Sequence, residues 1–452
     1  MTVIVVALVA LAVLGLLALV HRWLWIRLVR DTTRPGGLPR RAGTALAFVL
    51  PLAAVAALVA GRAGAPFRLQ QAVAWPGFMW LAVLLYLTLA MLVGEVVRAV
   101  WLRRIEPRAA RTPAPASASV TAPASASASA PAPASVPVDA AAAPDPAAAP
   151  DAAAAPDAAA EAAPGPTPVP GPVFDPAVLT RRRFVARTVG GTAAAAALAT
   201  VGYGTYGVLR GPRVKRVRVP LAKLPRAAHG FRIAVVSDVH LGPILGSAHT
   251  RRVVDAVNGT QPDLIAVVGD LVDGSVPDLG RAAEPLRGLR ARHGSFFVTG
   301  NHEYFSGAQQ WVDHVRELGL QPLENARRAL PYFDLAGVND VAGESEGHGP
   351  DFRAALGDRD RSRTAVLLAH QPIVIHDAVR HGVDLQLSGH THGGQLWPGN
   401  HLAELANPTV AGLERYGDTQ LYVSRGAGAW GPPVRVGAPS DITVVELASY
   451  QA

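Results

Sequence analysis

The sequence contains no cysteine, so the chain forms no disulfide and offers no thiolate to a metal ion. A transition metal would therefore have to be held by histidine, aspartate, glutamate or asparagine side chains. The absence of cysteine also leaves the redox compartment of the protein undetermined. The net charge is +8, but the sequence contains no basic stretch with interleaved aromatic residues and no nucleic-acid-binding module. We therefore expect no nucleic-acid partner.

Charged residues are absent from long apolar runs near the N-terminus. Thr2–Val20 carries none, and at about 1.5 Å per residue this run can cross the roughly 30 Å hydrocarbon core of a bilayer. Thr44–Ala60 and Phe78–Gly94 are two further predicted spans. No basic region precedes the first run and no small-residue cleavage motif follows it, which argues against a cleaved signal peptide. We therefore predict a membrane domain with three transmembrane helices at residues 1–104.

Arginine is distributed unevenly around these runs. Six arginines lie between the first and second runs, whereas only Arg62 and Arg68 lie between the second and third. Arg103 and Arg104 follow the third run, and Arg108 lies just beyond them. Because short loops rich in arginine stay in the cytoplasm, the first connection and the region after the third run are both predicted to be cytoplasmic.

Residues 105–180 are dominated by alanine, proline and serine, with imperfect Ala-Ala-Ala-Pro-Asp repeats around Pro144, Pro150 and Pro156. Such a composition buries too little apolar surface to offset the entropy lost on ordering. We therefore predict a disordered, extended cytoplasmic linker over this range.

A second membrane signal lies at residues 181–211. Arg181, Arg182 and Arg183 precede the uncharged stretch Val189–Leu209, an arrangement similar to a twin-arginine export signal placed internally. We predict a fourth transmembrane helix here; the alternative is a loose alanine-rich helix packed on the following domain. If the stretch crosses the membrane, the rest of the chain is extracytoplasmic, and otherwise it is cytoplasmic. The basic residues that follow Leu209 weaken this orientation signal.

Residues 212–452 alternate between apolar, strand-like runs and amphipathic stretches, a pattern typical of an α/β or sandwich-type core. Five of the runs end directly before polar side chains. Because ligands of α/β sheets bind beyond the carboxyl ends of the strands, we expect these side chains to lie together. They are Asp238, His240, Asp270, Asn301, His370, His390 and His392.

A cation is expected between these side chains, because burying so many polar groups at one sheet edge without one would be costly. Nitrogen and oxygen donors without sulfur suit Mn, Fe or Zn. Seven donors exceed what one ion usually takes from a protein. We therefore predict two adjacent divalent metal ions that share a carboxylate.

The same segments resemble, in order, the five motif blocks of the calcineurin-like metallophosphoesterases. They read DVH, GDLVDG, GNHE, a lone histidine before Gln-Pro, and GHTH. The resemblance covers about residues 214–448 and implies a four-layer α-β-β-α sandwich, with helices flanking two β-sheets. SGHTHGGQLWPG and the segment Ser424 to Arg435 are similar to a membrane-associated or exported bacterial branch, whose members are described as acting on phospholipid-type or other phosphodiesters.

The resemblance also implies roles for individual residues. One metal ion would be held by Asp238, His240, Asp270 and His392, and the other by Asp270, Asn301, His370 and His390. Asp270 would bridge the two ions, and a hydroxide between them would attack the phosphorus atom. His302 would donate a proton or hydrogen bond to the leaving oxygen, with Asp273 orienting its ring.

Several alternatives stay open at this point. Asp273 could instead cap the helix that follows it. The favoured function is a membrane-anchored phosphoesterase that hydrolyses a phosphodiester or phosphomonoester. Proximity to the membrane suggests a lipid or cell-envelope substrate, and the expected location is the cell membrane with an extracytoplasmic catalytic domain. The alternative is a non-catalytic metal-binding interaction module, which would need neither His302 nor Asp273.

Overall fold

The computed structural model describes residues 2–109 and 176–451. Most of the linker predicted for residues 105–180 lies outside the described residues. Met1–Val100 and Arg183–Ala452 belong to one compact unit, and Trp101–Arg182 is separate from it.

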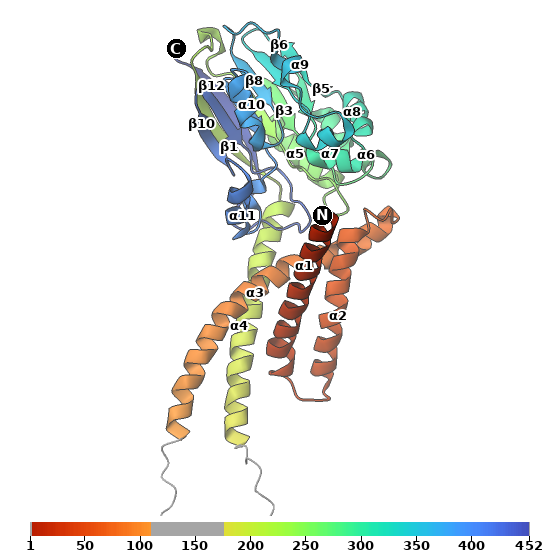
Figure 1. The fold of residues 1–452 in the computed structure, drawn as a ribbon, viewed down its shortest axis with the longest axis vertical. Helices are drawn as coiled ribbons and strands as arrows, with labels where there is room; N and C mark the ends of the chain where they lie inside the picture. Colours follow the sequence, from red (N-terminus) through yellow and green to blue (C-terminus); the bar gives the residue numbers. More distant parts are fainter. Residues whose placement is uncertain (1, 110–175, 452) are drawn as a thin grey trace, which may run out of the picture. The chain divides into compact units, whose positions relative to one another are not determined.

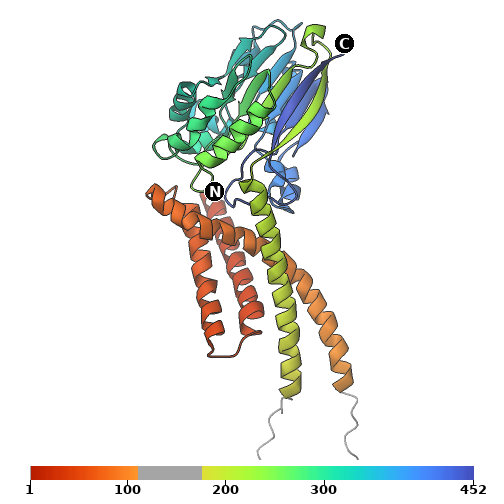
Figure 2. The same ribbon diagram turned by 180° about the vertical axis from the view of Figure 1, so that it is seen from behind.

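The N-terminal part of the described chain is helical (Figure 1). Helix α1 (Thr2–Trp25) continues through a π-helical turn, η1 (Ile26–Arg30), and is followed by α2 (Leu38–Val59) and α3 (Phe67–Ala109). Helix α4 (Pro176–Leu209) leads into the first strand, as Figure 2 shows from behind. In the described ranges, four helical segments are long and apolar enough to cross a membrane: Leu11–Arg30, Leu38–Val59, Phe67–Arg104 and Arg181–Leu209. The expected membrane helices are therefore present.

Small residues allow these helices to approach one another closely. A Cβ atom at Gly77 of α3 would overlap the carbonyl oxygen of Ala53 in α2, and it would lie 2.6 Å from the Cβ atom of Ala57. Glycine is therefore required where α3 crosses α2. The Arg27 guanidinium also lies 2.7 Å from the Glu95 carboxylate, which links the turn η1 to α3.

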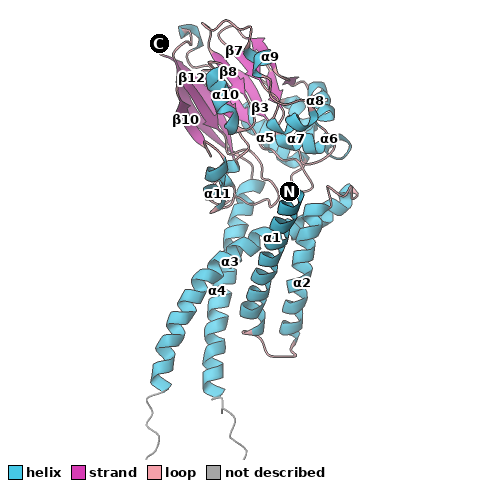
Figure 3. Ribbon diagram, in the orientation of Figure 1, coloured by secondary structure: helices cyan, strands magenta, loops and turns pink. Residues whose placement is uncertain are grey.

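Two six-stranded sheets form the C-terminal part of the described chain (Figure 3). The first has the order β1 (Arg213–Leu221), β12 (Asp441–Ser449), β2 (Arg232–Val236), β3 (Leu264–Val268), β4 (Ser295–Val298) and β5 (Gln321–Pro322). The second has the order β10 (Gly412–Tyr416), β11 (Thr419–Val423), β9 (Leu385–Ser388), β8 (Ala365–Leu368), β7 (Asp334–Gly337) and β6 (Ala326–Ala329).

The central strands are fully buried and read as continuous apolar runs, as parallel strands covered on both faces do. Strands β2, β3 and β4 pair in parallel, and so do β8 and β9. Their carboxyl ends therefore emerge at one edge of each sheet.

Three apolar clusters separate four layers. Side chains of both sheets, including Val235 and Leu385, fill the space between the sheets. Helices α5 (Ser247–Gly259), α6 (Val276–Ala283) and α8 (Ala308–Glu317) cover the outer face of the first sheet. Helices α9 (Phe352–Leu356) and α10 (Ile375–Arg380) cover the outer face of the second. The predicted four-layer sandwich is therefore confirmed.

The sandwich also contacts the membrane helices directly. Leu396, Val434 and Val436 pack in the same apolar cluster as side chains of α1, α3 and α4. The Tyr86 hydroxyl of α3 donates a hydrogen bond to the Trp397 carbonyl (3.0 Å). Because Trp397 lies two residues before α11 (Gly399–Ala406), this part of the sandwich is fixed to α3.

Candidate metal centre and active site

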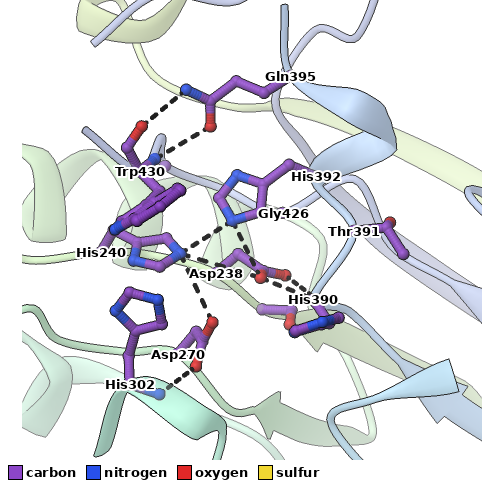
Figure 4. Close-up of polar contacts among 12 residues, drawn as sticks. Asp238, His240, Asp270, His302, His390, Thr391, His392, Gln395, Gly426 and Trp430 are labelled. Carbon is purple, nitrogen blue, oxygen red and sulfur yellow. Dashed lines mark hydrogen bonds and ion pairs between the residues drawn. The ribbon is translucent and has the colours of Figure 1, made fainter. Parts of the chain in front are cut away.

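All seven predicted ligands lie together at the ends of five strands. Asp238 and His240 follow β2, Asp270 follows β3, and Asn301 begins the short helix α7 (Asn301–Ser306) after β4. His370 follows β8, and the loop after β9 carries His390 and His392. Figure 4 shows imidazole rings from both sheets arranged around the Asp238 and Asp270 carboxylates. The expected convergence of the strand ends is present.

One group of donors consists of Asp238, His240 and His392. The Nε2 atoms of His240 and His392 lie 2.9 Å apart. Nε2 of His392 also lies 3.3 Å from Oδ1 of Asp238. The three side chains are buried, so solvent does not compensate this concentration of lone pairs and negative charge.

A second group consists of Asp270, His370 and His390. Nδ1 of His370 lies 2.9 Å from the Val268 carbonyl, to which it can only donate, so the neutral ring presents Nε2 as an acceptor. That atom is buried, forms no hydrogen bond within the described chain, and lies 3.1 Å from Oδ2 of Asp270. Burial lowers the pKa of His370, but Asp270 outweighs this effect and raises it well above its usual value. Without a metal ion a proton on Nε2 would therefore join the two atoms, and a metal ion can take the place of that proton.

Asp270 lies between the two groups. Its Oδ2 atom faces Nε2 of His370 and, at 3.8 Å, Nε2 of His240. Its Oδ1 atom accepts a hydrogen bond from the backbone N–H of His302 (2.9 Å). Oδ1 of Asn301 lies 3.0 Å from Nδ1 of His390, which places Asn301 beside the second group.

The backbone is strained at most of these positions. Eight non-glycine residues in the described ranges have a positive φ, and five of them are predicted ligands. These are Asp238 (52°), His240 (48°), Asp270 (52°), His390 (73°) and His392 (53°). Left-handed conformations cost free energy for residues with a Cβ atom, and such strain clusters at functional sites. It therefore marks this strand edge independently of the residue types.

Burial and neighbouring charges set the protonation of the cluster. Burial lowers the pKa of both His390 and His392 to about 4, so both rings are neutral near pH 7 and keep a lone pair for coordination. Burial alone would raise the pKa of Asp238, but His392 and the other nearby histidines lower it below its usual range. His240 and His370 differ, because neighbouring carboxylates outweigh burial and raise their pKa values, that of His240 to about 9. These two rings would release a proton on binding a metal ion, whereas His390 and His392 are already neutral donors of the kind that transition metals prefer.

Asp273 contacts two histidines with one oxygen. Its Oδ1 atom lies 2.9 Å from Nδ1 of His240 and 2.7 Å from Nδ1 of His302. The interactions with both rings lower the pKa of Asp273 below its usual range despite its burial. The ionised carboxylate can only accept, so each Nδ1 donates and each Nε2 remains free. The helix that follows begins at Val276, and its N-cap, Ser275, has no side-chain capping bond, so the helix-cap alternative for Asp273 is wrong.

Comparisons with known proteins agree with this geometry. Residues 231–394 match the family described as "Calcineurin-like phosphoesterase". A Helicobacter pylori protein named "Uncharacterized metallophosphoesterase" is 38% identical over 256 residues, which cover 55% of this chain and 68% of that protein. The chain belongs to the calcineurin-like phosphoesterase family.

Relatives of this chain also include proteins named for a membrane part. A zebrafish (Danio rerio) "Transmembrane protein with metallophosphoesterase domain" is 38% identical over 259 residues, covering 54% of this chain and 59% of that protein. Bacillus subtilis "Uncharacterized metallophosphoesterase YkuE" is 29% identical over 287 residues, covering 60% of this chain and 98% of that protein. The chain thus spans less than two thirds of the zebrafish relative. Together with the four apolar helices, the zebrafish similarity supports membrane association.

The structure of this family member adds residues to which the sequence analysis assigned no role. Arg435 is buried, and its Nη1 atom donates to the His392 carbonyl (3.0 Å), while its Nε atom donates to the Gly428 carbonyl (2.7 Å). It therefore holds the GHTH loop against the neighbouring loop. Arg435 lies within the segment recognised by its family similarity, but its role depends on a contact 43 residues away in sequence.

Glu303 is a second supporting residue. It is fully buried and accepts hydrogen bonds from the backbone N–H groups of Gly300 (2.6 Å), Leu271 (2.7 Å) and Asp270 (3.0 Å). Burial raises its pKa to about 7. Glu303 thereby joins the loops after β3 and β4 and fixes the backbone of the central ligand.

Trp430 lies over the site. Its backbone N–H donates to Oε1 of Gln395 (3.0 Å), and Nε2 of Gln395 donates back to the Trp430 carbonyl (2.9 Å). The Trp430 indole lies 5.7 Å from the His302 ring, centroid to centroid, and is 53% exposed (Figure 4). An exposed aromatic ring beside His302 can contact a substrate.

Proposed function

We propose that this protein is a membrane-anchored phosphoesterase that binds two divalent metal ions and hydrolyses a phosphodiester or phosphomonoester. The observation that carries the proposal is the contact between Asp273 and His302 beside the two donor groups. His240, Asp273 and His302 are also close enough together to hold a metal ion, but the two donor groups account for two ions without His302. A histidine held in place beside them favours an enzyme over a non-catalytic metal-binding module.

The ligand assignment follows the two donor groups. Asp238, His240, Asp270 and His392 would hold one ion, and Asp270, Asn301, His370 and His390 would hold the other. The position of Asp270 Oδ2 between His240 and His370 supports its role as a bridge. The nitrogen and oxygen donors suit Mn, Fe or Zn.

When bound, the two ions would activate a water molecule as the nucleophile and polarise the phosphate oxygens. The chain itself would supply the proton for the leaving group. Since Asp273 accepts from Nδ1 of His302, the free Nε2 of His302 is the atom that would donate this proton. Asp273 would keep the ring in this orientation, and through His240 it would also orient a metal ligand.

We further propose that the catalytic domain is extracytoplasmic in a multi-pass protein. The arginine-rich connection between α1 and α2 lies at the far end of α2 from the catalytic site. Arg40 donates to the Arg30 carbonyl there, and Arg187, near the start of α4, donates to the Thr32 carbonyl. The positive-inside rule favours the cytoplasm for this end, which leaves the catalytic domain on the other side.

The activity can be tested with the full-length protein in nanodiscs, loaded with Mn²⁺ and given bis-p-nitrophenyl phosphate and p-nitrophenyl phosphate. We expect release of p-nitrophenol from one of them, and loss of that activity after chelation. A folded, metal-loaded protein that hydrolyses neither compound with Mn²⁺, Fe²⁺ or Zn²⁺ would refute the proposal.

A further inference from the structure

A cavity of about 420 Å³ joins the candidate active site to the membrane helices. His240, Asp273 and His302 line one part of this cavity. The turn between α2 and α3 lines another part and includes Arg62. The proposed chemical site therefore shares its open space with a segment that lies more than 150 residues earlier in the chain.

The wall formed by the membrane helices is mainly apolar. Ala57 and Leu58 from the last turn of α2 line the cavity, together with Phe67, Ala74 and Phe78 of α3. All five belong to segments long and apolar enough to span a bilayer. Arg62 is the one charged side chain among the residues of α2, α3 and the turn between them that line the cavity. The rest of this wall suits an aliphatic group.

Polar groups in the same wall are engaged within it. Nε2 of Gln70 donates to the Ala65 carbonyl (2.8 Å), and Nη1 of Arg62 donates to the Leu58 carbonyl (3.3 Å). Both hydrogen bonds thus pair these side chains with backbone carbonyls of the same helix–turn segment. They leave the aliphatic and aromatic side chains as the main surface that this wall presents to the cavity.

The active-site side contributes aromatic surface. The Phe305 and Trp430 rings lie 5.6 Å and 5.7 Å from the His302 ring, and both line the cavity. Phe305 is 71% exposed and Trp430 is 53% exposed. Exposed aromatic rings that flank a proton donor provide apolar contact area next to the scissile bond.

Several contacts hold the helical wall in place. Phe67 packs against the apolar cluster that covers the first sheet, which includes Leu279 and Trp311. The Phe78 ring lies close to Gly431, because a Cβ atom at that glycine would be 3.8 Å from two ring carbons. Since both ends of this stretch of α3 contact the sandwich, the wall belongs to the same folded unit as the metal centre.

The cavity lies at the level where a membrane surface would be. Leu38–Val59 has 22 residues, and at about 1.5 Å per residue it matches the roughly 30 Å hydrocarbon thickness. If α2 spans the bilayer over this length, its end at Val59 lies at the boundary of the hydrocarbon core. Ala57 and Leu58 lie just inside this boundary, whereas His302 belongs to the domain beyond it.

We propose that α2 and α3 form part of the substrate-binding site, and that the cavity binds an aliphatic chain of a phosphoester whose phosphate lies at the metal centre. The ligand class is thus an amphiphilic phosphoester taken from the membrane surface. This inference rests on the proposed phosphoesterase function. It assigns the membrane helices a role in substrate selection in addition to anchoring.

The test compares two substrates with the same scissile bond. Full-length protein in nanodiscs receives methyl p-nitrophenyl phosphate or dodecyl p-nitrophenyl phosphate. The wild type should show a kcat/KM at least about tenfold higher for the dodecyl compound. In Leu58→Trp and Ala74→Leu, which reduce the cavity, the ratio of the two kcat/KM values should fall about tenfold, mainly through KM for the dodecyl compound.

Val55→Trp is the matched control. Val55 is also an exposed aliphatic residue of α2, 51% exposed against 44% for Leu58, but it does not line the cavity. This variant should keep the wild-type ratio within twofold. Equal kcat/KM values for the two substrates in the wild type would overturn the inference. So would a wild-type ratio of the two kcat/KM values in both cavity variants, provided that these variants fold like the wild type.

A second measurement does not depend on turnover. A dodecyl phosphonate that carries a photoreactive diazirine at the chain end should label peptides from residues 57–78 of the full-length protein. Labelling confined to other segments would overturn the inference even if the enzyme is active. If residues 57–78 are labelled but neither substrate is hydrolysed, the proposed phosphoesterase function is contradicted, whereas the proposed binding site for the aliphatic chain is supported.

Discussion

Oδ1 of Asp273 lies 2.7 Å from Nδ1 of His302 and also 2.9 Å from Nδ1 of His240. One carboxylate oxygen thus orients the proposed proton donor and a proposed metal ligand together. The T-shaped packing of the two rings, whose centroids are 4.8 Å apart, keeps them in separate orientations around this oxygen. Through this oxygen, proton donation by His302 and metal binding by His240 would be coupled.

His302→Ala should remove the proton donor and leave the metal ligands unchanged. We expect kcat to fall by roughly 10²- to 10⁴-fold, the usual contribution of a positioned acid. Metal content, measured by inductively coupled plasma mass spectrometry, should stay at two ions per chain. A variant that loses metal in proportion to activity would show that His302 is a ligand instead.

Asp273→Asn should have a broader effect than His302→Ala. The amide can present its NH₂ group to both rings, so neither histidine keeps the orientation that the carboxylate imposes. We expect metal affinity to fall by about 10- to 100-fold, as for other partners of ligating histidines, together with a loss of kcat. Metal titration with activity as the readout measures both effects. Metal affinity equal to that of the wild type would contradict the link through His240.

His392→Ala should leave the protein with about one metal ion per chain, because His392 belongs to one donor group only. His401→Ala is a suitable control, since His401 is an exposed histidine of α11 that belongs to neither group. Its metal content should match that of the wild type. Retention of two tightly bound ions by His392→Ala would refute the proposed ligand assignment.

Gly389→Ala should destabilise the candidate metal centre, because a side chain at this position has no space. A Cβ atom at Gly389 would overlap Oγ of Ser237 and Oδ2 of Asp238, both of which are fully buried. We expect the free energy of unfolding to decrease by about 1–3 kcal/mol and the metal content to fall.

Gly259→Ala provides the comparison for Gly389→Ala, because a Cβ atom at this helical glycine meets no atom within 4 Å. Its melting temperature should be equal to or slightly above that of the wild type. Thermal unfolding of the two variants side by side measures the difference. Equal melting temperatures would contradict the steric argument.

The orientation of the catalytic domain can be measured in intact cells. A protease-cleavable tag at the C-terminus should be removed by protease added outside, whereas a tag inserted within residues 105–180 should be protected. Protection of both tags would place the catalytic domain in the cytoplasm and would mean that α4 does not cross the membrane. Removal of the tag within residues 105–180 alone would mean that α4 crosses in the opposite direction.

The donor residues of the candidate metal centre could be predicted because each lies within four residues of the end of a strand. Leu264–Val268 and Ala365–Leu368 were recognisable as buried strands from their apolar runs, and Asp270 and His370 lie two residues beyond them. Parallel strands end at a common edge, so local sequence was sufficient to bring these residues together. The strained backbone at Asp270 was not predictable, since nothing in the residue types requires a positive φ there.

The membrane helices were predicted less completely. Helix α3 starts at Phe67, whereas the apolar run starts at Phe78. Arg68, Gln70 and Pro76 interrupt the hydropathy pattern in the first part of the helix. That part lies against the sandwich, where Phe67 packs on its apolar cluster, so tertiary contacts and not hydropathy determine where the helix begins.

By itself, the sequence determined the strands, the donor residues and the apolar runs of the membrane helices. Each of these depends on residues that are neighbours in sequence and on the periodicity of apolar residues along the chain. Only the tertiary structure decided which side chains share a partner. The double contact of Asp273, the position of Arg435 behind His392 and the cavity between His302 and α2 each join segments distant in sequence. Such contacts follow from the packing of layers and helices, which no local pattern encodes.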